Sequence, residues 1–149
     1  MKYLLLVVLA MMTISTTSFA KSKNVYADVL VTNISPADDA LWKRKETAPP
    51  LYPIALARSG LQGCTVLSFD ISESGKAKNI EAIQSIPHKN LGKYSRKMLK
   101  KWKWIPVTTA GEAKTEKRTL RLDFCLGDQS PEQTLQRCQQ QTQLACNSN

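Results

Sequence analysis

The chain has 149 residues, of which 42% are hydrophobic and 22% are charged, and its formal net charge is +9 at pH 7. This length suits one domain with a modest hydrophobic core. After the first 20 residues, no segment is apolar for the roughly 20 residues that a membrane-spanning helix needs. The excess of positive charge fits an acidic partner or nucleic acid.

The first residues have the organisation of a secretory signal peptide. Lys2 supplies the positive start, Tyr3–Met12 is apolar, and Ser18 and Ala20 hold the −3 and −1 positions of a cut after Ala20. The alternative is a retained membrane anchor, but the apolar run is short for that role. We predict cleavage after Ala20 and export, which takes the chain away from nucleic acid.

The cysteines are predicted to form disulfides. Cys64, Cys125, Cys138 and Cys146 all follow the predicted cleavage site, and an even number of cysteines in an exported chain indicates disulfide bonds. The sequence does not choose among the three possible pairings. A metal site is the weaker alternative, because there is no CxxC spacing and His88 is the only histidine.

The N-terminal third is predicted to contain little regular structure. Alternating apolar residues in 25–34 are compatible with one strand, and the rest of 21–50 reads as a loosely packed leader. A helical turn is predicted to begin at Pro53, where the missing N–H is harmless, and to end at Gly60.

A β-hairpin is predicted next. Residues 64–71 alternate, with Thr65, Leu67, Phe69 and Ile71 on one face. Residues 73–76 form a turn that contains Gly75, and residues 77–86 form the second strand.

One long helix and one further strand complete the predicted fold. Apolar residues recur at helical spacing over 91–104, and Pro106 stops the helix. Residues 117–126 alternate again, and the Gln-rich segment 131–146 favours a helix. We therefore predict an α+β domain in which a small antiparallel sheet of three strands, in β-β-α-β order, packs one long amphipathic helix on one face.

Several motifs in this order resemble the TonB C-terminal domain family, the periplasmic end of an energy transducer. They are Tyr52-Pro53, Gly63 opening Cys-Thr-Val-Leu-Ser-Phe-Asp-Ile, Gly75, Leu99-Lys-Lys-Trp-Lys-Trp-Ile-Pro106, and Leu122-Asp-Phe-Cys-Leu126. The resemblance covers about Pro50 to Gly127. It divides the chain into a signal peptide (1–20), a leader (21–50), a TonB C-terminal-like domain (51–127) and a Cys-containing tail (128–149).

The resemblance implies a binding edge on the last strand. In the family, an extended peptide of an outer-membrane receptor adds to the equivalent strand by β-augmentation. Carried over, this implies contacts from Arg118, Arg121 and Asp123, with Tyr52 and Pro53 nearby. The alternative is that residues 25–34 or the Gln-rich tail cover this edge.

The resemblance also implies a disulfide pairing. If the first and last strands of the domain are antiparallel neighbours, as in the family, then Cys64 and Cys125 meet. Cys138 and Cys146 would then pair, which requires a bend between them because eight residues of straight helix span about 12 Å. The alternative is that Cys138 or Cys146 staples the tail to the sheet.

Two further features have alternative interpretations. The basic segment 93–103 is either the solvated face of a helix or a contact for an acidic partner, lipopolysaccharide or anionic phospholipid. Trp42 either docks the leader onto the domain or meets a partner.

The functional prediction is protein binding without catalysis. The sequence contains no catalytic or phosphate-binding motif, so we predict no enzymatic activity and no cofactor. We expect a periplasmic, soluble partner or modulator of TonB-type outer-membrane transport that engages a receptor peptide or TonB itself. The alternatives are an envelope module that holds peptidoglycan or an outer-membrane component, and a short energy transducer that keeps its N-terminal helix. A monomer or a strand-paired dimer is expected.

Overall fold

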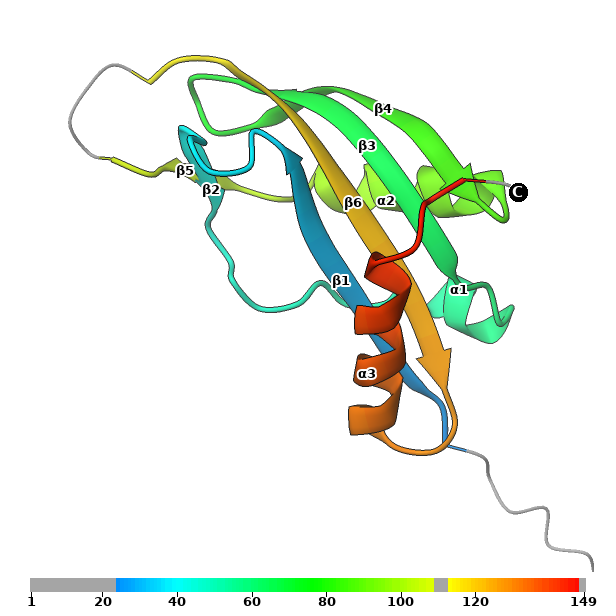
Figure 1. Ribbon diagram of the computed structural model, residues 1–149. Coiled ribbons are helices and arrows are strands. Elements are labelled where there is room, and N and C mark those ends of the chain that lie inside the picture. Colours follow the sequence, from blue (N-terminus) through cyan, green and yellow to red (C-terminus); the bar gives the residue numbers. More distant parts are fainter. Residues whose placement is uncertain (1–23, 109–112, 148–149) are drawn as a thin grey trace, which may run out of the picture.

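The computed structural model describes residues 24–108 and 113–147 and has an α+β architecture (Figure 1). The predicted signal peptide lies outside the described residues. In chain order the elements are β1 (Tyr26–Ser35), β2 (Trp42–Arg44), α1 (Ile54–Arg58), β3 (Gly63–Ile71), β4 (Ala77–Ile86), α2 (Lys89–Leu99), β5 (Trp104–Pro106), β6 (Glu116–Gly127) and α3 (Pro131–Thr142).

The described residues form a four-stranded antiparallel sheet of order β1-β6-β3-β4 and a separate two-stranded sheet of β2 and β5. Helix α2 packs on one face, against β3 and β4, and α3 packs against β1 and β6 (Figure 1). The α+β class is therefore confirmed, with a fourth strand added at the β6 side of the predicted sheet.

The apolar rows of β3 and β6 build the core as predicted. Thr65, Leu67, Phe69 and Ile71 are buried, and so are Leu120, Leu122 and Phe124 of β6 and Leu91 and Leu99 of α2. Because successive side chains of a strand point to opposite faces, the intervening residues of both strands lie on the side of the sheet that carries α3. The core thus lies between the sheet and α2, and a second, more polar layer lies under α3.

The strand that the sequence allowed at 25–34 is confirmed as β1, whereas the rest of the segment, which was predicted to be a loosely packed leader, supplies β2. Val29 of β1 is 1% exposed and Trp42 of β2 is 4% exposed. The indole nitrogen of Trp42 donates a hydrogen bond to the Lys114 carbonyl oxygen (2.8 Å). Trp42 therefore docks its segment onto the domain, which is the first of its two predicted roles.

Helix α2 ends at Leu99, earlier than the predicted end at residue 104. Trp104 lies in β5 opposite Arg44, and its ring packs against that of Phe69 with 5.5 Å between centroids. His88 is the N-cap of α2, and its Nδ1 accepts a hydrogen bond from the Asn90 amide (3.1 Å). The prediction of a helix is wrong for residues 100–104 because Trp104 enters the core from the extended strand β5.

The hairpin turn depends on Gly75, which has φ +69°; a Cβ added there would lie 2.2 Å from the Trp104 carbonyl oxygen. We expect Gly75→Ala to lower the free energy of unfolding by more than the roughly 1–2 kcal/mol that left-handed backbone costs an L-residue. Urea denaturation followed by circular dichroism measures the loss. Gly60→Ala is the matched control, since Gly60 has φ +64° and open space around it. Equal losses in the two variants would contradict the steric argument.

Candidate functional site

The strand that was predicted to be a binding edge, β6, lies inside the sheet. It pairs with β3 on one side and with β1 on the other, where Val29 lies opposite Phe124 and Val31 opposite Leu122. The prediction of a free edge is wrong, and the alternative, coverage by residues 25–34, is confirmed. The physical reason is that Val29 and Val31 extend the apolar row of β6 across one more strand.

Arg118 is 2% exposed and ties β6 to the smaller sheet. Its guanidinium forms an ion pair with Glu116 (2.8 Å), donates a hydrogen bond to the Trp42 carbonyl oxygen (2.9 Å) and lies over the Trp104 ring. Burial lowers the pKa of the Arg118 guanidinium, and Glu116 opposes that effect. This arrangement uses the guanidinium of Arg118 to join elements inside the fold, and not as a contact on a free strand edge.

Arg121 and Asp123 hold the tail onto the sheet. Nε and Nη2 of Arg121 donate to the two carboxylate oxygens of Asp123 (2.8 and 2.7 Å), and Asp123 is fully buried. The same guanidinium donates to the carbonyl oxygens of Gln141 (2.9 Å) and Leu144, at the C-terminal end of α3. A cation at that end of a helix also interacts favourably with the helix dipole. Both side chains therefore have structural roles. They were predicted to contact a partner at a free strand edge, but they are buried between β6 and the tail.

The disulfides join the sheet to the tail. Cys64 bonds Cys146, and Cys125 bonds Cys138. The pairing implied by the resemblance is wrong because Cys64 lies opposite Asp123 and the β3–β6 ladder ends before Cys125. Both strand cysteines face α3, so each finds its partner in the tail. The alternative, a cysteine staple between tail and sheet, is confirmed at both positions.

Tyr52 and Pro53 lie beside an open groove of about 870 Å³ between residues 46–54 and α2. The Tyr52 ring meets Phe124 edge-on (5.6 Å between centroids), and its hydroxyl donates to the Leu61 carbonyl oxygen (2.6 Å). Burial raises the pKa of this hydroxyl. Leu51, next to them, is 90% exposed. Unlike the β6 residues, this pair borders a surface that a partner can reach.

Strand β4 forms one outer edge of the sheet, and that edge is blunted. Its register with β3 shifts twice, and Asn79 has a left-handed backbone (φ 51°). Lys78 adds a charge beside it. Bulges and lysines of this kind discourage the addition of another strand.

Strand β1 forms the other outer edge, and that edge is regular. Its register with β6 is continuous from Tyr26 to Asn33, and this stretch contains no Lys, Arg or Pro. Among the described residues no strand pairs with its outer side. Sequence reasoning missed this edge, although the alternation of Val29 and Val31 in a stretch without cations was its signal.

The part of the chain that the structure describes offers neither a candidate metal site nor a helix that could span a membrane. Within residues 24–108 and 113–147, no three or more His, Cys, Asp or Glu side chains are grouped in a way that could hold a metal ion. None of the helices in these two ranges is both long and apolar enough to cross a bilayer.

Comparison with known proteins identifies the family. The family described as "Gram-negative bacterial TonB protein C-terminal" matches residues 48–126, just over half of the chain. Protein TonB of Xanthomonas campestris pv. campestris (strain B100) is 28% identical over 82 residues, which are 55% of this chain and 37% of that protein. Protein TonB of Pseudomonas aeruginosa is 25% identical over 76 residues, 51% of this chain and 22% of that protein.

A solved structure matches as well. The solution NMR structure of the Pseudomonas aeruginosa TonB C-terminal domain aligns with a TM-score of 0.46 and 24% identity, over 58% of this chain and 87% of that one. The matched stretch covers little more than a third of the Xanthomonas relative. TonB C-terminal domains are periplasmic in Gram-negative bacteria, and TonB proteins are energy transducers and not enzymes. The chain belongs to the family of Gram-negative bacterial TonB C-terminal domains.

Proposed function

We propose that this chain is an exported, periplasmic protein-binding domain that acts as a soluble partner or modulator of TonB-type outer-membrane transport. It recognises an extended segment of its partner by strand addition to the outer edge of β1. The observation that carries this proposal is the regular ladder of β1 from Tyr26 to Asn33, which contains no Lys, Arg or Pro and lies at the open side of the sheet. Unpaired backbone groups on such an edge accept another strand.

The surroundings of β1 suggest the chemistry of the partner segment. Val31 and Asn33 border a cavity of about 360 Å³ that also touches Trp42, Trp104 and Arg44. A strand added to β1 places side chains beside this cavity. Aromatic walls with a cation at the rim favour an apolar or acidic side chain there.

A partner strand has a second route, which is to displace β1 and pair with β6 directly. Val29 opposes this route because it is 1% exposed and packs in the core. Helix α3 adds a further barrier because it packs on β1 as well as on β6. Addition to the outer edge leaves these contacts in place, and we therefore favour it.

Two neighbouring proline variants test the proposal. Adjacent residues of a strand direct their N–H groups to opposite sides, so Thr32→Pro and Asn33→Pro each remove one N–H, one toward β6 and the other toward the open edge. The variant that loses the outward N–H should keep its stability and bind the partner about tenfold more weakly, equivalent to one or two hydrogen bonds. The other should lose about 1–3 kcal/mol of unfolding free energy.

Fluorescence anisotropy with TonB-box peptides of receptors, and with the periplasmic part of TonB, measures the binding. Sedimentation with peptidoglycan tests the envelope-module alternative, and ultracentrifugation detects a homodimer paired through β1. Unchanged partner binding by the stable proline variant would refute outer-edge addition. Binding to peptidoglycan alone would replace the proposed role.

The mass of the purified mature protein tests export. A protein that begins at Lys21 and lacks four thiol hydrogens supports the proposal. An intact N-terminus in the membrane fraction would favour the short energy transducer instead.

A further inference from the structure

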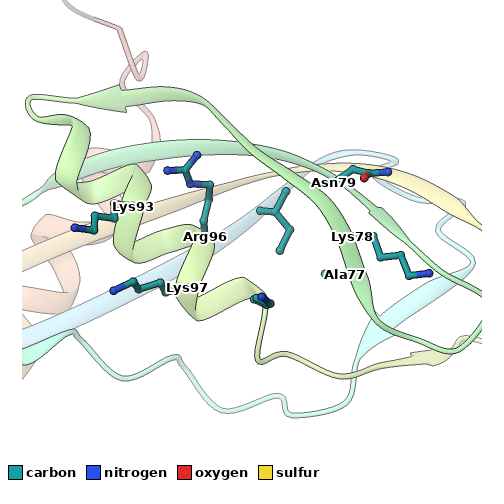
Figure 2. Close-up of a pocket in the computed structure, with 8 residues that line it drawn as sticks. Ala77, Lys78, Asn79, Lys93, Arg96 and Lys97 are labelled. Atoms are coloured by element: carbon teal, nitrogen blue, oxygen red, sulfur yellow. The ribbon is translucent and has the colours of Figure 1, made fainter.

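A basic cleft lies at the side of the sheet opposite to β1, between the start of β4 and α2 (Figure 2). Its volume is about 580 Å³, which is in the range of ligand sites. The residues that line it are Ala77, Lys78, Asn79, Ile80, Lys93, Arg96, Lys97 and Lys100. Figure 2 shows Lys93, Arg96 and Lys97 projecting from the helix, whereas Lys78 lies on the neighbouring strand and its side chain extends away from the helix.

Among the residues that the structure describes, the five cations that line this cleft form no ion pair with a carboxylate. The ion pairs seen among the described residues belong to Arg118 and Arg121 instead. Asp70, which is near Lys78 in the ladder, accepts a hydrogen bond from the Asn79 amide (2.7 Å). The cleft therefore concentrates positive charge that nothing in the described protein neutralises.

Helix electrostatics explain part of this charge. Arg96 and Lys97 lie in the last turn of α2, where cations interact favourably with the helix dipole. The same explanation does not reach Lys93, which is in an earlier turn, or Lys78, which is on a strand. Four of the five cations therefore come from α2 and its C-cap, and Ala77 and Ile80 of β4 supply the apolar part of the cleft beside them.

We infer that this cleft binds the phosphate groups of anionic phospholipids and holds the α2 side of the domain against a membrane surface. Lys93, Arg96, Lys97 and Lys100 are spread over about two turns along α2 and its C-cap, which matches a plane of phosphates better than one small anion. Ala77 and Ile80 give the cleft an apolar part, which suits the boundary between headgroup and acyl chain. An acidic peptide is the weaker occupant, because the blunted edge of β4 does not accept a strand.

The strand order makes this site compatible with protein binding. Strands β4 and β1 are the opposite edges of the sheet, so a membrane at the β4 side leaves the β1 edge open. The inference does not rest on the proposed function, and each can fail without the other.

Vesicle flotation tests the inference with the full mature chain. We expect binding to vesicles of phosphatidylcholine with phosphatidylglycerol, and none to phosphatidylcholine alone. Lys93→Gln, Arg96→Gln and Lys100→Gln combined should weaken partitioning on the order of 100-fold, since each cation near an anionic surface contributes about fivefold. Added salt should weaken binding by the wild-type protein.

A matched triple variant removes the same charge elsewhere. Lys45→Gln, Lys114→Gln and Lys117→Gln combined change exposed lysines outside the cleft and should partition almost like the wild type. Equal losses of vesicle binding in the two triple variants would show that net charge alone causes the binding, and would overturn the cleft as a specific site. Binding to polyglutamate but not to vesicles, or full competition by inorganic phosphate, would overturn the membrane surface as the ligand.

Discussion

Replacing Cys64 and Cys146 with alanine is expected to lower the free energy of unfolding by about 4.5 kcal/mol. The bond joins residues 82 positions apart, and in the chain-entropy model a loop of this length strongly restricts the unfolded chain. It also fixes the end of the tail next to β3. Guanidinium denaturation of the wild type and of the variant measures the difference. Non-reducing conditions keep the Cys125–Cys138 disulfide formed in both proteins.

The second disulfide is the matched control. Cys125 and Cys138 are 13 positions apart, and the same model gives about 3 kcal/mol for their bond. Replacing this pair with alanine should therefore cost less than replacing the first. The reverse order, or a loss below about 1 kcal/mol for Cys64 and Cys146, would show that the tail is held mainly by its packing.

Arg121→Ala is expected to destabilise the protein by about 3–5 kcal/mol, because it leaves the carboxylate of Asp123 buried and unpaired. Asp123 is fully buried, and its other side-chain partner is the Gln141 amide, which donates to it at 2.9 Å. The same substitution removes the hydrogen bonds to the end of α3. Thermal and urea unfolding should both report the loss.

A double-mutant cycle separates the pair from the tail contacts. Adding Asp123→Asn to Arg121→Ala removes the unpaired, buried carboxylate and should restore part of the free energy of unfolding. Arg121→Lys keeps the charge but not the two parallel hydrogen bonds, and should fall between the wild type and Arg121→Ala. A loss for Arg121→Ala as small as that of an exposed ion pair, about 1 kcal/mol or less, would contradict this description.

The sequence correctly predicted the strand in which one face is apolar and buried, and the turn that needs a glycine. The row Thr65, Leu67, Phe69 and Ile71 alternates with more polar residues, and its four members are buried as predicted. The turn at Gly75 followed from the need for positive φ. In both places a local pattern is enough, since no distant residue changes which face is apolar.

The polar face of β6 was the main error at the candidate site. Arg121 and Asp123 alternate with apolar residues, which is the pattern of a strand with one face in water. That face is covered by α3, and the two charges satisfy each other and the end of that helix. Period-2 alternation records polarity and not exposure, so the sequence alone could not distinguish a solvated face from a paired, buried one.

The predictions of the cysteine pairing and of the end of α2 were wrong for a related reason. The pairing depends on the register of β3 and β6: Cys64 lies opposite Asp123, two positions from Cys125, and both cysteines bond to the tail instead. Trp102 and Trp104 fit both helical and strand spacing over so short a segment. Contacts from distant parts of the chain, including Trp42 and the tail, decided both outcomes.

The pairing of Tyr26 with Gly127 sets the order of events when the protein is made. The earliest strand of the domain has its ladder partner near the end of the chain, and such non-local pairing makes folding slow. Until β6 emerges, Val29 and its apolar neighbours stay without a partner strand and expose a segment prone to aggregation. A chaperone that holds the newly made chain would therefore be needed most for the first residues described here.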